Sequence, residues 1–338
     1  MTPRRRILPI FVPHAGCPND CVFCNQKRIS GSLLPASAET VRQAVSALAP
    51  GSGYELAFYG GSFTAIPENE QEELLRACVP ARESGAVSVL RVSTRPDAVT
   101  PEKLARLRFY GVETVELGAQ SMCDEVLRRS GRGHTAADTV KAAALIKASG
   151  FSLILQMMTG LPGSSDARDI ETARAVAALS PDGVRIYPTV IVRDTPLYDL
   201  WTAGAYREHT VEDAVRVCAE IVPVFERAHI PIIRLGLNPS DELSGGAAAG
   251  GAYHPALGEL VRSRIWRDKA ERLLSAAAAP GESVILGVAP NRISVMTGQH
   301  RANLTYLRER FSLADVRILA ADVDDGEIVL LEVAKSGR

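Results

Sequence analysis

Residues 8–24 read LPIFVPHAGCPNDCVFC, a short apolar run that leads directly into three closely spaced cysteines. The cysteines Cys17, Cys21 and Cys24 follow the spacing C-x3-C-x2-C, so one loop can place three thiolates around a single inorganic centre. The apolar run from Leu8 to Val12 predicts a β-strand, with the cysteine loop at its carboxyl end. Because thiolates bind zinc and iron–sulfur centres, this stretch predicts a metal site.

Outward from this loop, short apolar runs alternate with longer segments of helical periodicity. We expect strands at Leu8–Val12, Glu55–Tyr59, Val87–Ser93, Thr114–Gly118, Leu153–Met157 and Val184–Tyr187. Helical patterns lie near residues 38–48, 68–82, 101–109, 135–148, 168–179 and 211–227. Parallel neighbours need crossover helices, so the alternation predicts an α/β fold with a parallel sheet, either open or curled into a partial (β/α)6 barrel. Ligands of such sheets gather at the carboxyl ends of the strands.

The composition divides the chain into three expected parts. Residues 1–243 carry the barrel pattern, and residues 244–281 begin with SGGAAAGG, which predicts a flexible linker before a connecting helix. Residues 282–338 form a small α/β domain whose order of strand, helix, helix, strand and strand resembles the KH-type RNA-binding core. Its GXXG-like loop is GQHR at 298–301, with Arg301 in place of the last glycine. The alternative is a purely structural domain.

The overall composition is that of an ordinary globular protein. The 338 residues are 46% hydrophobic and 23% charged, which excludes disordered, collagenous and coiled-coil classes. No run approaches the ~20 apolar residues of a membrane span, so we expect no membrane contact. The formal net charge of −1 means that any contact with nucleic acid is local. We expect a cytoplasmic protein with reduced thiols, in which Cys78, Cys123 and Cys218 are core residues.

Polar and glycine-rich motifs follow the later strands. Residues 58–64 read FYGGSFT, and a glycine pair at a strand end permits a tight turn and close approach to a ligand. Residues 93–97 read STRPD and residues 116–121 read ELGAQS. Helix capping accounts for several of these polar residues, but it does not account for Arg95, Glu116 and Gln120. We therefore expect these three side chains at the mouth of the barrel.

The combination of these motifs resembles the radical S-adenosylmethionine (SAM) superfamily. Between residues 14 and 201 the chain is similar to the radical-SAM domain of the Elongator catalytic subunit and its bacterial relatives. The stretches that carry this similarity are the cysteine loop, YGGSFT (59–64), STRPD (93–97), GAQS (118–121), GRGHT (131–135), RIYPT (185–189) and LYDLW (197–201). The resemblance implies a 4Fe–4S cluster on Cys17, Cys21 and Cys24, with one iron open to SAM. It also implies reductive cleavage of SAM to a 5′-deoxyadenosyl radical that abstracts a hydrogen from the substrate.

The same resemblance implies roles and partners. We expect SAM to be bound by Gly60, Gly61, Ser62, Arg95 and Glu116, and catalysis to involve Gln120 and Tyr187. Elongator's subunit acts on the wobble uridine of tRNA with SAM and acetyl-CoA, so the implied partners are tRNA and an electron donor of the flavodoxin or ferredoxin type. The first cysteine gap is shorter here, and no stretch corresponds to the acetyltransferase domain, so the resemblance does not extend to acetyl-CoA.

Two alternatives remain open at this point. The short cysteine gap is closer to the oxygen-independent coproporphyrinogen oxidase branch, which favours a small-molecule substrate. A zinc site of the three cysteines and His14 would instead make a non-catalytic binding module. An RNA substrate requires basic side chains near the site, because phosphate contacts dominate affinity. The candidates are Arg4, Arg5, Arg6, Lys27, Arg28, Arg301, Arg308 and Arg310.

Overall fold

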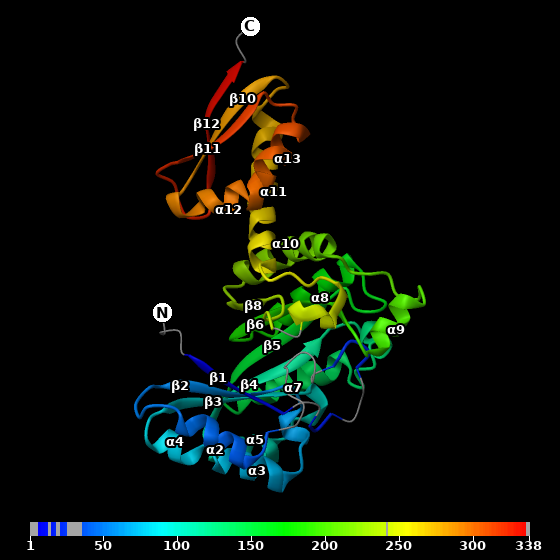
Figure 1. The fold of residues 1–338 in the computed structure, drawn as a ribbon, viewed down its shortest axis with the longest axis vertical. Coiled ribbons are helices and arrows are strands. Elements are labelled where there is room, and N and C mark those ends of the chain that lie inside the picture. The colour runs from blue at the N-terminus through cyan, green and yellow to red at the C-terminus, as the bar shows by residue number, and fades with distance from the viewer. Residues whose placement is uncertain (1–5, 13–14, 18–20, 26–35, 241–242, 336–338) are drawn as a thin grey trace. The chain divides into compact units, whose positions relative to one another are not determined.

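The computed structural model describes residues 6–12, 15–17, 21–25, 36–240 and 243–335. These residues fall into two compact units, Met1–Ala214 with Ile221–Pro255 and Val215–Glu220 with Ala256–Arg338. Figure 1 shows both units. Within the described residues, no helix is both long enough and apolar enough to span a membrane.

The first unit is built on a seven-stranded parallel sheet in the order β1-β2-β3-β4-β5-β6-β8 (Figure 1). Its strands are β1 (Ile7–Phe11), β2 (Tyr54–Tyr59), β3 (Val87–Thr94), β4 (Val112–Gln120), β5 (Ser152–Thr159), β6 (Gly183–Pro188) and β8 (Ile232–Leu235). Four strand spacings of about 4.8 Å each separate β2 from β6 in a flat sheet. Arg185 Nη2 on β6 nevertheless donates to Tyr59 Oη on β2 at 2.8 Å. The sheet is therefore curled into a half-barrel, which confirms the predicted fold class with one more strand than expected.

Helices connect the parallel strands, as crossover connections require. They are α2 (Ala38–Ser46), α3 (Glu68–Arg76), α4 (Val79–Glu83), α5 (Pro101–Phe109), α6 (Asp124–Arg129), α7 (Ala136–Ala148), α8 (Asp166–Ala178), α9 (Pro196–Thr202) and α10 (Val211–Arg227). The single helix predicted over 68–82 is two helices, because Pro80 has no N–H to continue the hydrogen-bond ladder of α3.

The two faces of the curled sheet differ in polarity. Leu56, Phe58, Leu90, Leu117 and Ile186 are fully buried, and they alternate along their strands with polar or charged residues. The alternate residues on β2, β3, β4 and β6 include Glu55, Tyr59, Arg91, Glu116, Arg185 and Tyr187, which contact one another across the concave side. The half-barrel therefore packs an apolar face against its helices and encloses a polar interior.

The glycine- and alanine-rich stretch after residue 243 is more ordered than the sequence predicts. A π-helical turn, η3 (Leu243–Ala247), leads into β9 (Ala248–Gly251), which pairs antiparallel with β7 (Val190–Val192). Small residues suit this pairing because a Cβ on Gly251 would lie 2.7 Å from the carbonyl oxygen of Thr189. The first part of the predicted linker is therefore a strand.

The second unit contains the long helix α11 (Leu257–Ala277) and a small α/β fold. The remaining elements are β10 (Glu282–Val288), α12 (Ile293–Thr297), α13 (Ala302–Arg310), β11 (Asp315–Ala320) and β12 (Ile328–Lys335). Strand β10 lies in the centre of the sheet, parallel to β11 and antiparallel to β12. Trp266, Leu274, Leu286 and Leu307 are among the buried side chains that form its core. The order of elements is the one that the sequence predicts.

Candidate functional site

The cysteine loop lies at the carboxyl end of β1, as the sequence predicts. Cys21 is buried, Cys24 is half-buried and Cys17 is exposed. The backbone N–H of Cys24 donates to the carbonyl of Cys21 at 2.9 Å, so the chain makes a tight turn between the two cysteines. Within the described ranges, no three or more His, Cys, Asp or Glu side chains lie close enough together to hold a metal ion. His14, the predicted fourth zinc ligand, lies outside the described residues.

Two distant segments hold the second half of the cysteine loop. The backbone N–H of Val22 donates to the carbonyl of Ser130 at 3.1 Å, at the end of α6. The carbonyl of Val22 accepts from the N–H of Leu197 at 2.8 Å, in the first turn of α9. Val22 lies between Cys21 and Cys24, so these two bonds fix the backbone that carries both cysteines.

The glycine pair after β2 packs tightly against the first half of the loop. The N–H of Ser62 donates to the carbonyl of Ala15 at 2.8 Å. A Cβ on Gly61 would lie 2.4 Å from the carbonyl oxygen of Val12 and 2.5 Å from that of Ala15, so only glycine fits there. Gly60 has φ +87°, a left-handed conformation that glycine adopts without a steric penalty. The predicted glycine pair therefore supports the cysteine loop directly.

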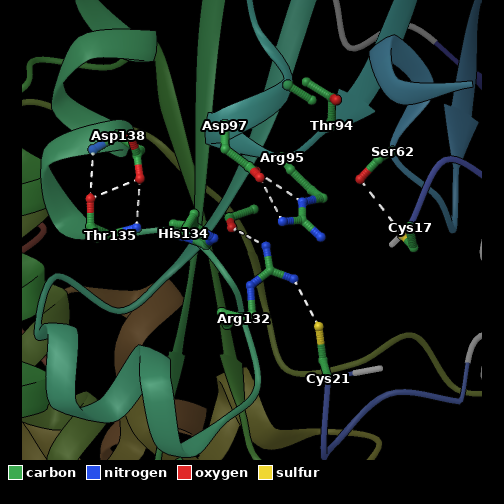
Figure 2. A network of polar contacts seen from close by, with 12 residues as sticks. Cys17, Cys21, Ser62, Thr94, Arg95, Asp97, Arg132, His134, Thr135 and Asp138 are labelled. Atoms are coloured by element: carbon green, nitrogen blue, oxygen red, sulfur yellow. Dashed lines mark hydrogen bonds and ion pairs between the residues drawn. The ribbon is translucent and has the colours of Figure 1, made fainter. Parts of the chain in front are cut away.

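Polar side chains surround the cysteines, as Figure 2 shows. Cys17 Sγ donates to Ser62 Oγ at 3.6 Å. Arg132, which is buried, donates from Nη1 to Cys21 Sγ at 3.2 Å and from Nη2 to the carbonyl of Gly118 at 2.7 Å. The structure thus brings Ser62, a predicted SAM-binding residue, to the cysteines, and it adds Arg132, which is not among the predicted site residues.

Arg95 is the second arginine near the cysteines (Figure 2). Its guanidinium donates to both carboxylate oxygens of Asp97, at 2.9 and 2.7 Å. Burial opposes the charge of Arg95, but the ion pair with Asp97 and the nearby thiols of Cys17 and Cys21 outweigh it and raise its pKa. Arg95 therefore stays positively charged beside the cysteine loop.

A buried charge network fills the interior of the half-barrel. The carboxylate of Glu116 lies 3.0 Å from Arg185 Nε and 3.4 Å from Arg91 Nη1. Arg185 also donates to Tyr187 Oη at 3.1 Å and to Tyr59 Oη at 2.8 Å. Burial, and then the charge of Glu116, raise the pKa of Tyr59 to about 12. Burial also raises the pKa of Tyr187, so both phenols are neutral at pH 7.

Gln120 ends β4 in an unusual backbone conformation. Its φ is +63°, which is rare for a residue other than glycine. Its side-chain oxygen accepts from Gln156 Nε2 at 3.1 Å. Glu116, Gln120 and Tyr187 thus belong to the polar interior, while Gly60, Gly61, Ser62 and Arg95 surround the cysteine loop.

The loop and the interior share an apolar contact. Phe23, between Cys21 and Cys24, packs against the same small cluster of Val126, Met158 and Leu161 as Tyr187 does. Tyr187 therefore lies within one layer of side chains of the cysteine loop. Arg132 and Arg185 lie within two of the sequence motifs, GRGHT (131–135) and RIYPT (185–189), but the motif spacing does not indicate which residues their side chains contact.

Comparison with protein families accounts for this arrangement. The radical SAM superfamily model matches residues 11–176, and the radical SAM C-terminal domain model matches residues 181–267. The chain belongs to the radical SAM superfamily. The first match contains all three cysteines, the glycine pair and the strand ends around them. The protein is thus a radical SAM enzyme.

Curated relatives of this radical SAM enzyme include Elongator complex protein 3 and tRNA uridine(34) acetyltransferases. Elongator complex protein 3 of Mus musculus is 32% identical over 199 residues, which are 52% of this chain and 36% of the relative. The tRNA uridine(34) acetyltransferase of Methanocaldococcus infernus is 31% identical over 188 residues, which are 50% of this chain and 35% of that protein. The matches therefore span about a third of the length of these relatives.

Solved structures show the same fold. The archaeal Elp3 of Methanocaldococcus infernus, with an N-terminal deletion, superposes with a TM-score of 0.62 at 23% identity, over 78% of this chain and 63% of that one. Methylornithine synthase superposes with a TM-score of 0.51 at 16% identity, over 69% of this chain and 72% of that one. Both structures therefore share their fold with this chain.

The superfamily uses a 4Fe–4S cluster and SAM, and these are the cofactors of this enzyme. The donor set fits an iron–sulfur cluster, since the three side chains of the loop are thiols, with arginines at Cys21 and near Cys17. A Cβ on Gly61 would clash with the backbone of the cysteine loop, so glycine at this position lets the two backbone segments lie close together.

Proposed function

We propose that this radical SAM enzyme modifies RNA and that its substrate is a tRNA. The observation that carries the proposal is the match, at 31% identity over half of the chain, to a relative named for its action on tRNA uridine 34. Because the matched region is about a third of that relative's length, the proposal covers the radical SAM part of the chemistry and leaves acetyl transfer out.

In this proposal each group around the loop has a defined task. Cys17, Cys21 and Cys24 hold the cluster, and the backbone at Gly60 and Gly61 lies against the methionine end of SAM. When bound, a 4Fe–4S cluster supplies the electron that cleaves SAM, so an external donor of the flavodoxin or ferredoxin type must supply that electron. Ser62 and Arg95 stand beside the cysteines and orient the bound groups.

The polar interior receives the reacting part of the substrate in this proposal. Gln120 and Tyr187 line it and exclude bulk water, and the neutral phenol of Tyr187 keeps its proton. Glu116 is the proposed further contact of SAM, and its two oxygens already face Arg185 and Arg91. The two arginines fix the position of the carboxylate.

RNA contact is proposed at the loop of the second unit. His300 and Arg301 are exposed, and both have positive φ, at +52° and +61°. Arg301 thus adopts a left-handed backbone conformation, which glycine favours, and it adds a cation that can contact phosphate. Of the other basic candidates, Arg6 is exposed, while Arg4, Arg5, Lys27 and Arg28 lie outside the described residues.

Anaerobic reconstitution with iron and sulfide tests the catalytic part. We expect about four irons per chain, and 5′-deoxyadenosine after reduction in the presence of SAM. Cys21→Ala should lose both, whereas Cys78→Ala, at a buried cysteine far from the loop in sequence, should keep iron binding. A colourless protein that binds zinc and forms no 5′-deoxyadenosine contradicts the assignment of the cysteines.

A binding experiment tests the RNA part. We expect labelled bulk tRNA to bind with an affinity that falls as salt rises, because phosphate contacts release counterions. Arg301→Ala should weaken binding and reduce the slope of log affinity against log salt by about 1. The matched control is Arg174→Ala, at an exposed arginine of α8. Binding without a salt slope, together with no effect of Arg301→Ala, contradicts the RNA proposal and favours a small-molecule substrate.

A further inference from the structure

Arg132 contacts the sulfur of Cys21, and this contact suggests a role for the arginine at the cysteine loop. Arg132 is 8% exposed and donates from Nη1 to Cys21 Sγ at 3.2 Å. Its other terminal nitrogen donates to the carbonyl of Gly118 on β4 at 2.7 Å. The guanidinium is therefore held by the end of β4 and directed at one sulfur of the cysteine loop (Figure 2).

The backbone beside Arg132 holds the same part of the loop. The carbonyl of Ser130, two residues earlier, accepts from the N–H of Val22, the residue that follows Cys21. The segment 130–132 thus binds the cysteine loop twice, once through its backbone and once through a charged side chain. Two contacts from one short segment fix the distance between the guanidinium and the sulfur.

A charged donor at a ligand sulfur changes the energy of the cluster's two oxidation states. Reduction adds one negative charge to the cluster and its thiolates, so a cation and an N–H directed at a sulfur stabilise the reduced state more than the oxidised state. Arg132 and Cys21 are both buried, so water screens this interaction only weakly. The expected result is a higher reduction potential.

We propose that Arg132 raises the reduction potential of the cluster through its hydrogen bond to the sulfur of Cys21. This inference rests on the proposed assignment of Cys21 as a cluster ligand. Arg132 is a positioning residue, since it acts through Cys21 and the one electron still comes from the external donor. Arg95 also lies near the thiols of Cys17 and Cys21, but it differs from Arg132 because its guanidinium donates to both carboxylate oxygens of Asp97.

The test compares reconstituted wild type with Arg132→Gln and Arg132→Lys. Gln removes the charge, and Lys keeps the charge but cannot reproduce the planar fork that reaches Cys21 and Gly118 together. The matched control is Arg128→Gln, at an exposed arginine of neighbouring α6 that pairs with Glu125. The measurement is a redox titration of the cluster followed by electron paramagnetic resonance, with iron and sulfide content determined on the same samples.

We expect the ratio of reduced to oxidised cluster in Arg132→Gln to fall about tenfold at the wild-type midpoint, a shift of about 59 mV to more negative potential for one electron. Arg132→Lys should shift less in the same direction, and Arg128→Gln should not shift. A wild-type midpoint in Arg132→Gln with full iron content overturns the inference. If Arg132→Gln holds too little iron to titrate, an unchanged midpoint in Arg132→Lys overturns it. A wild-type chain that binds no cluster instead overturns the proposed function.

Discussion

Glu116 shows what a single buried charge does in this half-barrel. It is 4% exposed and faces Arg185 and Arg91. Glu116→Gln removes the negative charge that pairs with these two buried cations. We therefore expect the free energy of unfolding to fall by about 3–5 kcal/mol. Urea denaturation measures the loss. The control Glu125→Gln breaks solvent-screened pairs on α6 and should cost much less, and equal losses would contradict this explanation.

Asp169 gives a pH dependence that is independent of the cysteine loop. It is buried in α8, accepts from the N–H of Gly160 at 2.8 Å, and burial raises its pKa to about 6. In the unfolded chain its pKa is about 3.9, so the folded state binds more protons between these values. The stability that this proton contributes is complete below pH 4 and is lost as the pH rises through 6.

The comparison that isolates this effect is wild type against Asp169→Asn, which does not titrate. The free energy of unfolding of wild type relative to Asp169→Asn should fall by about 2 kcal/mol between pH 4 and pH 7. Denaturation curves across this range measure it. A difference that does not change with pH shows that Asp169 is ionised throughout.

At the residue scale, the sequence predicts which chemical groups form the site better than it predicts which residues contact one another. The cysteines and the glycine pair are visible because spacing is local. Arg132 lies 111 residues from Cys21, and Arg185 lies 69 residues from Glu116, so neither contact follows from local spacing. The fold of the chain brings such residues together.

At the scale of elements, the turn after β2 and the cysteine loop form one interlocked structure. Gly61→Ala places a methyl group against the carbonyls of Val12 and Ala15, and neither backbone segment can yield without moving the loop. We expect a loss of about 1–3 kcal/mol of stability and less iron per chain after reconstitution. The matched control is Gly245→Ala, where a Cβ meets nothing within 4 Å. Wild-type iron content in Gly61→Ala would show that the loop tolerates displacement.

The elements that the sequence predicts best are those with long, regular patterns. The helices at 101–109 and 211–227 have the predicted limits, because Thr100 and Thr210 cap them with side-chain hydrogen bonds. Strand β8, with four half-buried residues, was missed because so short a run carries little periodicity. The pairing of β9 was missed because its alanines and glycines are typical of linkers.

At the scale of the whole molecule, each unit has a core of its own. Leu286 is fully buried in the core of the second unit, and Leu331 is 49% exposed on the same small sheet. Leu286→Ala should cost about 2–5 kcal/mol in the stability of that unit, and Leu331→Ala less than about 0.5 kcal/mol. We expect iron content to stay at the wild-type level in both variants. A lower iron content in Leu286→Ala would show that the stability of one core depends on the other.

The positive φ angles of His300 and Arg301 lower the stability of the second unit, while the Arg301 side chain contributes to the proposed binding of tRNA. A side chain in the left-handed conformation costs of order 1 kcal/mol that glycine avoids. Arg301→Gly should therefore make the second unit harder to unfold by about 1 kcal/mol while it weakens the binding of tRNA, and denaturation and tRNA titration of the same variant measure both. The two effects have opposite signs, so a search for more stable variants of this protein would select against the loop's proposed function.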